Sequence, residues 1–442
     1  MKIQLQDHFT YSKLLRFVFP AIVMMVFTSI YGVVDGFFVS NYVGKTGFAS
    51  INLIMPFIMI TSGIGFVFGS GGSALVSYHL GKQEKETANR YFTMMIIITT
   101  ILGICTSTLG YIFMEKIALF LGATEDMLHD CILYGRINML FNVPFMLQSL
   151  FQTLFTTAQK PKLGLYTTIA AGVSNMVLDF LLVGVFSFGI TGAAIATGVS
   201  QCIGGLFPIF YFLRPNTSLL KIVKTKLELE PIVKAAGNGA SEFMTNISSS
   251  IVSMLFNFQL LKYLGENGVA AYGVLMYVQF IFAAIFFGYT MGVSPIISYH
   301  YGAENHNELK NLFKKSYIII TISALVLTTT CKLTSPLLAK IFVGYSQELL
   351  DITINAFSLF CLSFLVSGFN IMSSAFFTAL NNGKISAIIS FARTLLFQAT
   401  SILFLPSLLG TNGIWLSPFV ADACTLFISI YFLLTSREYY HY

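Results

Sequence analysis

The chain has 442 residues, of which 55% are hydrophobic and 10% are charged, and its mean hydropathy is +0.77. Because soluble domains are roughly one quarter charged, this composition excludes a soluble multidomain protein, and the abundance of aromatic and aliphatic residues excludes a disordered chain. The net charge of +6 is too small to indicate nucleic-acid binding, and six cysteines without a CxxC pair indicate neither a disulfide scaffold nor a metal site. The remaining class is an all-α polytopic membrane protein.

Twelve apolar runs are long enough to cross a bilayer as helices, which takes about 20 residues each. In chain order they are 14–42, 50–78, 91–113, 131–157, 163–187, 191–213, 235–263, 270–299, 316–342, 352–380, 385–408 and 412–435. Membrane barrel strands are excluded because they are about ten residues long and alternate between apolar and polar residues. The sequence therefore predicts 12 transmembrane helices, six in each half of the chain.

Lysine and arginine residues are divided unevenly between the two sides that these spans define. The minority side carries six of the 25: Lys45, Lys116, Arg136, Lys262, Lys332 and Lys340. Arg393 lies within a span, and the other 18 lie on the side of both termini and of the central connection. Since cytoplasmic loops are enriched in basic residues, we expect a multi-pass protein of the plasma membrane or cell inner membrane with both termini in the cytoplasm.

One sequence offset relates the two halves of the chain. The segment 77–81 (SYHLG) returns as 298–302 (SYHYG), 221 residues later. The same offset pairs these glycines: Gly44 with Gly265, Gly71 with Gly292, and Gly189 with Gly410. Six spans per repeat make both halves enter the membrane in the same direction, so we predict two six-helix bundles related by a pseudo-two-fold axis along the membrane normal. The amino-terminal lobe is expected at 1–213, a cytoplasmic linker at 214–234 and the carboxyl-terminal lobe at 235–442.

Two acidic residues of the first half lie at one depth in the membrane. Asp35 and Asp179 each stand about eight residues from the outer ends of the first and fifth spans. Asn175 precedes Asp179 by one helical turn, and Thr197 lies about eight residues inward from the start of the sixth span. At 1.5 Å per residue, these four side chains share a layer roughly 12 Å below the outer surface.

Ionisable residues inside spans are costly and usually mark function. Two carboxylates, an amide oxygen and a hydroxyl suit a hard monovalent cation, so Asp35, Asn175, Asp179 and Thr197 are candidate Na⁺ ligands. Without a cation, two neighbouring carboxylates in a low dielectric resist double ionisation, and one of them could carry a proton instead. A purely structural reading, in which these side chains only bond helix to helix, is the alternative.

The combination of two six-span halves, Pro20 and Asp35 in the first span, and Asn175, Asp179 and Thr197 in spans five and six resembles the multidrug and toxic compound extrusion (MATE) family. The resemblance covers essentially the whole chain, and the stretch 237–242 (GNGASE) is closer to the bacterial MepA-like branch. It implies a secondary antiporter that exchanges inward Na⁺ or H⁺ for outward drugs, often amphipathic organic cations, by alternating access. It also implies a monomer with no cofactor besides the coupling ion.

The resemblance assigns further roles. Asp35, Asn175, Asp179 and Thr197 match the family's amino-lobe cation site, Glu242 resembles a coupling acid found in some members, and Pro20 matches a proline associated with bending of the first helix. Tyr31 and Gln152 are candidate cavity residues.

The second half of the chain departs from the first, since the counterparts of Asp35 and Asp179 are Phe256 and Thr400. The cation site is therefore expected in one lobe only. Glu242 and Arg393 lie at similar depth and are a candidate buried ion pair, because either charge alone would cost several kcal/mol in the membrane. Asp422 could compete for Arg393.

Two other functions fit parts of the pattern. A flippase for lipid-linked precursors would need a cationic cavity, yet Arg393 is the one basic residue deep in a span. An intramembrane aspartyl protease could use Asp35 and Asp179 as a dyad, but it leaves the duplication unexplained. The sequence contains no phosphate-binding loop of an ATPase, and we expect a transporter with no enzymatic activity.

Overall fold

The computed structural model describes residues 3–344 and 346–442, and Lys2, counted above among the basic residues, lies outside them. The first half of the described chain forms α1 (Tyr11–Tyr42), α2 (Lys45–Gly81), α3 (Lys85–Phe120), α4 (Glu125–Leu140), α5 (Asn142–Thr157), α6 (Pro161–Leu178), η1 (Asp179–Val185) and α7 (Gly189–Leu213). The second half forms α8 (Leu229–Gly302), α9 (His306–Val343), α10 (Gln347–Phe360), η2 (Cys361–Ser363), α11 (Phe364–Ala379), α12 (Gly383–Phe391), η3 (Ala392–Leu396), α13 (Phe397–Leu409), α14 (Thr411–Thr435) and α15 (Arg437–Tyr440).

The predicted all-helical fold with twelve crossings is confirmed. Ten helical segments of the described chain are long and apolar enough to span a membrane. One of them, α8, contains two crossings, because Gly265 at φ 62° and ψ −150° turns the chain between them. A further crossing is shared by α4 and α5, which meet at Phe141 and are each too short to span alone. Several helices run past the predicted ends, as α3 does to Phe120, because an apolar run measures only the hydrocarbon core.

The backbone repeats the offset of 221 residues. Gly44 (φ 90°) matches Gly265 (φ 62°), and Gly189 (φ 55°) matches Gly410 (φ 59°). These positions need glycine because L-residues with a side chain rarely adopt such angles. The break at Phe141 likewise corresponds to the 3-10 turn η2, so both lobes interrupt their fourth span at the same place.

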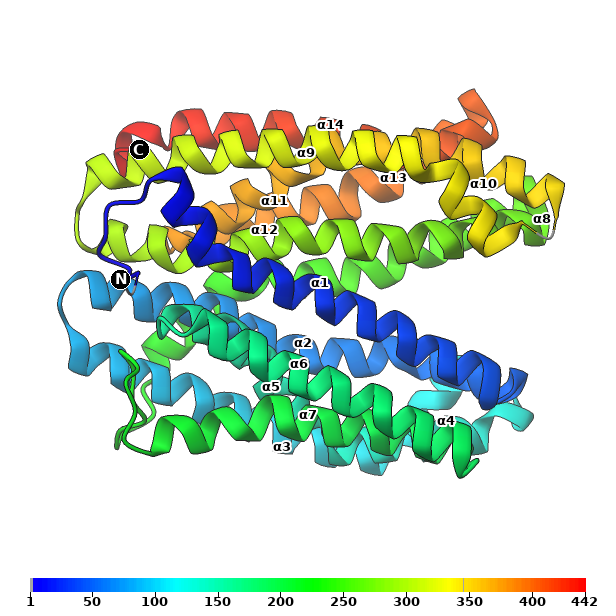
Figure 1. Ribbon diagram of the computed structural model, residues 1–442, viewed down its shortest axis with the longest axis horizontal. Coiled ribbons are helices and arrows are strands. Elements are labelled where there is room, and N and C mark those ends of the chain that lie inside the picture. Colours follow the sequence, from blue (N-terminus) through cyan, green and yellow to red (C-terminus); the bar gives the residue numbers. More distant parts are fainter. Residues whose placement is uncertain (1–2, 345) are drawn as a thin grey trace.

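The two lobes lie side by side, with both chain termini at one end of the molecule, which we call the terminus end (Figure 1). In the view of Figure 1, α2 to α7 form the lower group, α8 to α14 form the upper group, and α1 runs diagonally between them. The connection between the lobes packs on the first one, where the N–H of Lys221 donates to Asn89 Oδ1 at 2.9 Å and the N–H of Val223 to Thr93 Oγ1 at 3.0 Å. Because α8 begins at Leu229, it takes up the last six residues of the predicted linker.

Glycines bring the lobes into backbone contact at the terminus end. A Cβ on Gly81 would overlap the carbonyl oxygen of Tyr299, and a Cβ on Gly302 would overlap that of Tyr78. The two contacts are related by the internal repeat, so each lobe presents the same surface to the other. Nearby, the Ser298 hydroxyl donates to the carbonyl oxygen of Ala74 at 2.6 Å.

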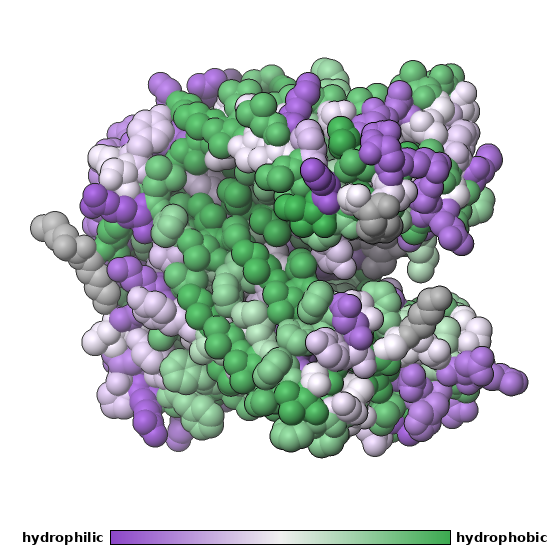
Figure 2. All heavy atoms as spheres, turned by 45° about the vertical axis from the view of Figure 1, so that its right-hand side comes forward, coloured by the Kyte–Doolittle hydropathy of each residue, from purple (hydrophilic) through white to green (hydrophobic). Residues whose placement is uncertain are grey.

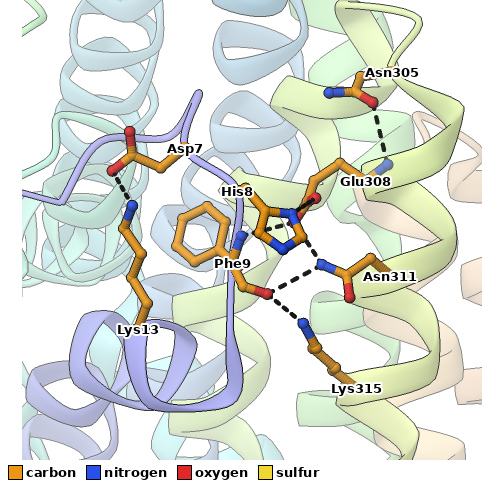
Figure 3. A network of polar contacts seen from close by, with 8 residues as sticks. All are labelled: Asp7, His8, Phe9, Lys13, Asn305, Glu308, Asn311 and Lys315. Carbon is orange, nitrogen blue, oxygen red and sulfur yellow. Dashed lines mark hydrogen bonds and ion pairs between the residues drawn. The ribbon is translucent and has the colours of Figure 1, made fainter.

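The chain before α1 fastens this end further by binding to α9 of the other lobe (Figure 3). The N–H of Phe9 donates to Glu308 Oε1 at 2.9 Å, and His8 Nδ1 lies 2.6 Å from Glu308 Oε2. The carbonyl oxygen of Phe9 accepts from Asn311 at 3.0 Å and from Lys315 at 2.6 Å. The Phe9 ring is completely buried.

The opposite end of the molecule is open. Figure 2 shows a notch between the two lobes there. Among the described residues, the hydrogen bond between the lobes that lies farthest from the terminus end joins the Ser29 hydroxyl to the Phe280 carbonyl oxygen. All the other hydrogen bonds between the lobes in this part of the chain lie closer to the terminus end. The structure is therefore closed at the terminus end and open at the other.

Candidate ion and substrate site

Close packing of α1 and α6 builds the site in the first lobe. Gly172 of α6 lies against the first helix, where a Cβ would come within 2.6 Å of Phe27 Cε1 and 2.8 Å of Tyr31 Cδ1. Small residues at such crossings let two membrane helices approach closely. Asp35 follows Tyr31 by four residues and Asp179 follows Gly172 by seven, which places the acids about 6 and 10 Å beyond the contact at 1.5 Å per residue.

The structure brings together three of the four predicted ion ligands. Asp35 lies close enough to Asp179 and Asn175 to interact with both. Asp179 and Asn175 are buried, with 0% and 1% exposure, whereas Asp35 is partly exposed. Thr197 lies on α7, which packs against both α6 and η1, but its hydroxyl forms no hydrogen bond to the three within the described part of the chain.

The polar atoms of this site lack partners. Oδ1 of Asp35, both carboxylate oxygens of Asp179 and both side-chain polar atoms of Asn175 are buried without a hydrogen bond. Neither acid belongs to any of the four ion pairs formed among residues 3–344 and 346–442. Because buried charges must be paired or neutralised, this arrangement fits a bound cation or a proton. Within the described chain, no group of three or more His, Cys, Asp or Glu residues is arranged to hold a metal ion.

A widened helical turn begins at Asp179. The π-helix η1 follows α6 directly, and in it the N–H of Phe186 donates to the carbonyl oxygen of Leu181 at 2.8 Å. Such turns are rare and occur frequently at functional sites. In the second lobe the π-helix η3 lies in the equivalent span and contains Arg393. Sequence reasoning missed both turns, since no residue pattern distinguishes them from α-helix.

Two further residues border the site and were missed as well. Tyr134 of α4 is buried and lies near both acids, and Gln148 of α5 lies against Tyr31. The predicted cavity residue Tyr31 is thus next to Asp35 and Gln148. Gln152, also predicted, is buried one turn closer to the terminus end, with Oε1 unpaired. No motif marks Tyr134, and only its depth in the fourth span could have suggested it.

The second lobe has no equivalent acidic pair. Phe256, the counterpart of Asp35, is buried and stacks on Tyr272 with ring centroids 4.8 Å apart. Thr400, the counterpart of Asp179, is exposed and bonds to its own helix. An aromatic stack therefore occupies one position where the first lobe carries an acid.

The charges of the second lobe interact at longer range. Arg393 attracts both Glu242 and Asp422, but the predicted Glu242–Arg393 ion pair is not formed within 4.0 Å among the described residues. Asn370 donates instead to the Asp422 carbonyl oxygen at 2.8 Å and accepts from Ser429 at 2.9 Å. The two residues are close enough for Arg393 to act electrostatically on Glu242, as their equal depth predicted, but they form no direct ion pair.

Pro20, the predicted hinge, is buried inside α1, which continues through it as one helix from Tyr11 to Tyr42. A hinge motion at Pro20 remains a prediction.

Comparison with known proteins places this architecture among transporters. The family model MatE matches residues 20–181 and 243–402 of the chain, one segment in each lobe. The multidrug export protein MepA of Staphylococcus haemolyticus is 23% identical over 434 residues, which cover 97% of this chain and 94% of that protein. The MepA of Staphylococcus saprophyticus is 27% identical over 368 residues, 80% of each chain.

Solved structures share the fold. A multidrug resistance MATE family transporter in an outward-facing conformation superposes with a TM-score of 0.91 at 21% identity, covering 99% of this chain and 98% of that one. A MATE protein in complex with MaL6 gives a TM-score of 0.90 at 21% identity, with 98% and 97% covered.

Proposed function

Because this chain belongs to the MatE family of multidrug efflux transporters, we propose that it exports amphipathic organic cations in exchange for Na⁺ or H⁺. The observation that carries the proposal is the proximity of Asp35 and Asp179, since three of their four carboxylate oxygens are buried without a hydrogen bond. Two acids brought together by adjacent helices of one lobe form a site that a small cation or a proton can neutralise.

The mechanism we propose is alternating access. The notch at the open end gives ions and drugs access from one side of the membrane, and the contacts at Gly81, Gly302 and Glu308 close the other side. The basic residues favour a cytoplasmic terminus end, which makes the present conformation the outward-open one. An ion that neutralises Asp35 and Asp179 removes the charge that holds a cationic drug, and drug release outward follows.

The drug would use the same region. An organic cation is attracted by a carboxylate and by aromatic faces, and Tyr31 and Tyr134 both lie beside Asp35. Each ligand shifts the equilibrium between the two states only by its differential affinity for them. Shared use of Asp35 by ion and drug provides that difference. Glu242 is a second candidate for coupling, in the lobe without an acidic pair.

The proposal is tested by efflux of a fluorescent organic cation from proteoliposomes under separately imposed Na⁺ and pH gradients. We expect one gradient to drive efflux in the wild type and Asp35→Asn to lose it, because the amide cannot take up a proton or balance a cation. Wild-type protein that moves none of several dyes under either gradient would contradict multidrug antiport and favour the lipid-precursor flippase.

A further inference from the structure

A groove of about 1100 Å³ lies on the outside of the first lobe, at the terminus end. It is formed by the first turns of α1 and α6 and reaches Tyr211 near the end of α7. Large apolar side chains line it, and two of them, Phe19 at 61% and Tyr166 at 63%, are exposed. In a multi-pass membrane protein such exposed aromatics face lipid, so the groove opens toward the bilayer rather than toward the Asp35 site.

Four basic residues line the mouth of the same groove: Lys13, Arg16, Lys160 and Lys162. Two of them are occupied. Lys13 Nζ pairs with Asp7 Oδ2 at 2.8 Å, and Lys160 Nζ donates to Thr217 Oγ1 at 2.6 Å. Burial acts to raise the pKa of Asp7, but the Gln4 N–H and the Lys13 ammonium group lower it below its ordinary value. Asp7 therefore stays ionised and keeps Lys13 engaged.

The other two basic residues are available to a ligand. Arg16 and Lys162 are exposed, and neither has an ion pair or a side-chain hydrogen bond among the residues that the structure describes. The α6 helix, which begins at Pro161, also has no side-chain cap, so its positive end adds to the field at the groove. The mouth of the groove is thus cationic and its walls are apolar.

We propose that this groove binds one anionic phospholipid, with the headgroup phosphate between Arg16 and Lys162 and an acyl chain along Phe19 and Tyr166. Charge selects the occupant, since two free cations repel the organic cations that the transporter would carry. Basic pockets between helices on the cytoplasmic side are typical sites for anionic headgroups. The lipid would join the first turn of α1 to that of α6, the two helices that supply Asp35 and Asp179. The lipid site rests on the proposed cytoplasmic location of the terminus end but not on the proposed transport activity.

The test measures lipid binding to the purified full-length protein by native mass spectrometry, with phosphatidylglycerol and phosphatidylcholine of identical acyl chains in competition. The variant is Arg16→Gln/Lys162→Gln. The control is Lys310→Gln/Lys314→Gln, which removes the same charge from exposed positions of α9 at the terminus end. Each basic residue near an anionic headgroup contributes roughly a fivefold preference, so we expect a preference of about tenfold or more for phosphatidylglycerol in wild type and control.

In the groove variant the preference should fall to about twofold or less. Thermal unfolding supplies a second readout: phosphatidylglycerol should stabilise wild type and control, whereas phosphatidylcholine and inorganic phosphate should not. Equal preference in groove variant and control would overturn the proposal, as would stabilisation by phosphate alone. Because neither readout needs efflux, failure here leaves antiport untouched, and loss of antiport leaves the lipid site untouched.

Discussion

Asp179→Asn is expected to abolish ion-driven efflux while leaving the fold intact. Asp179 is completely buried and its carboxylate oxygens have no hydrogen-bond partner, so an amide of the same size fits the space without breaking a bond. The amide carries no charge that Na⁺ or H⁺ could neutralise, so the energetic link between ion and drug is removed. Coupling between two sites is typically worth about 5–150-fold in affinity, and we expect gradient-driven efflux to fall by at least about tenfold.

The matched control is Asp351→Asn, an acid on α10 that is exposed and accepts from Gln347. It should transport like the wild type. The double variant Asp35→Asn/Asp179→Asn should be no worse than either single variant, because the two acids act as one site. Multiplicative losses in the double variant, or retained coupling in Asp179→Asn, would show that the acids work separately or only hold the helices together.

Gly302→Ala is expected to destabilise the protein and to loosen the terminus end. The added Cβ would overlap the carbonyl oxygen of Tyr78, and backbone on both sides of this contact cannot move aside as a flexible side chain could. Overpacking of this kind typically costs about 1–3 kcal/mol. The midpoint of thermal unfolding in detergent should fall, and a Ser298→Cys reporter in a cysteine-free background should become more reactive.

Gly273→Ala provides the control within the same helix. A Cβ there meets nothing within 4 Å, so alanine should be neutral or stabilising by up to about 1 kcal/mol through its helix propensity. We therefore expect Gly302→Ala to lower the free energy of unfolding and Gly273→Ala to leave it unchanged or raise it. If Gly302→Ala matched Gly273→Ala in stability and in reporter reactivity, the backbone contact at this end would not hold the lobes closed.

The sequence predicted what depends on distance along a helix. Counting residues from the span ends placed Asp35 and Asp179 at one depth, and the fixed offset of 221 residues paired Gly44 with Gly265, which both adopt positive φ in the structure. Both inferences hold because the rise per residue and the need for glycine at positive φ are local properties.

The sequence could not predict what depends on rotation about helix axes or on contacts between distant segments. Glu242 and Arg393 interact electrostatically, as their shared depth suggested, yet they form no ion pair within 4.0 Å. The repeat containing Gly81 and Gly302 was visible, but a repeat records an internal match and does not show which faces meet. Tyr134 lies near the acids on α4, which packs against α3, α2 and α7, and such packing between distant segments leaves no local sequence signal.

The central claim is that ion and drug compete through Asp35 and Asp179, and equilibrium binding tests it most directly. The measurement is fluorescence anisotropy of an organic cation bound to detergent-purified protein, titrated at increasing Na⁺ and, separately, at decreasing pH. We predict that one ion raises the apparent Kd of the dye by about 5–150-fold in the wild type and has no effect in Asp179→Asn. A dye Kd that neither ion changes in the wild type would contradict the account.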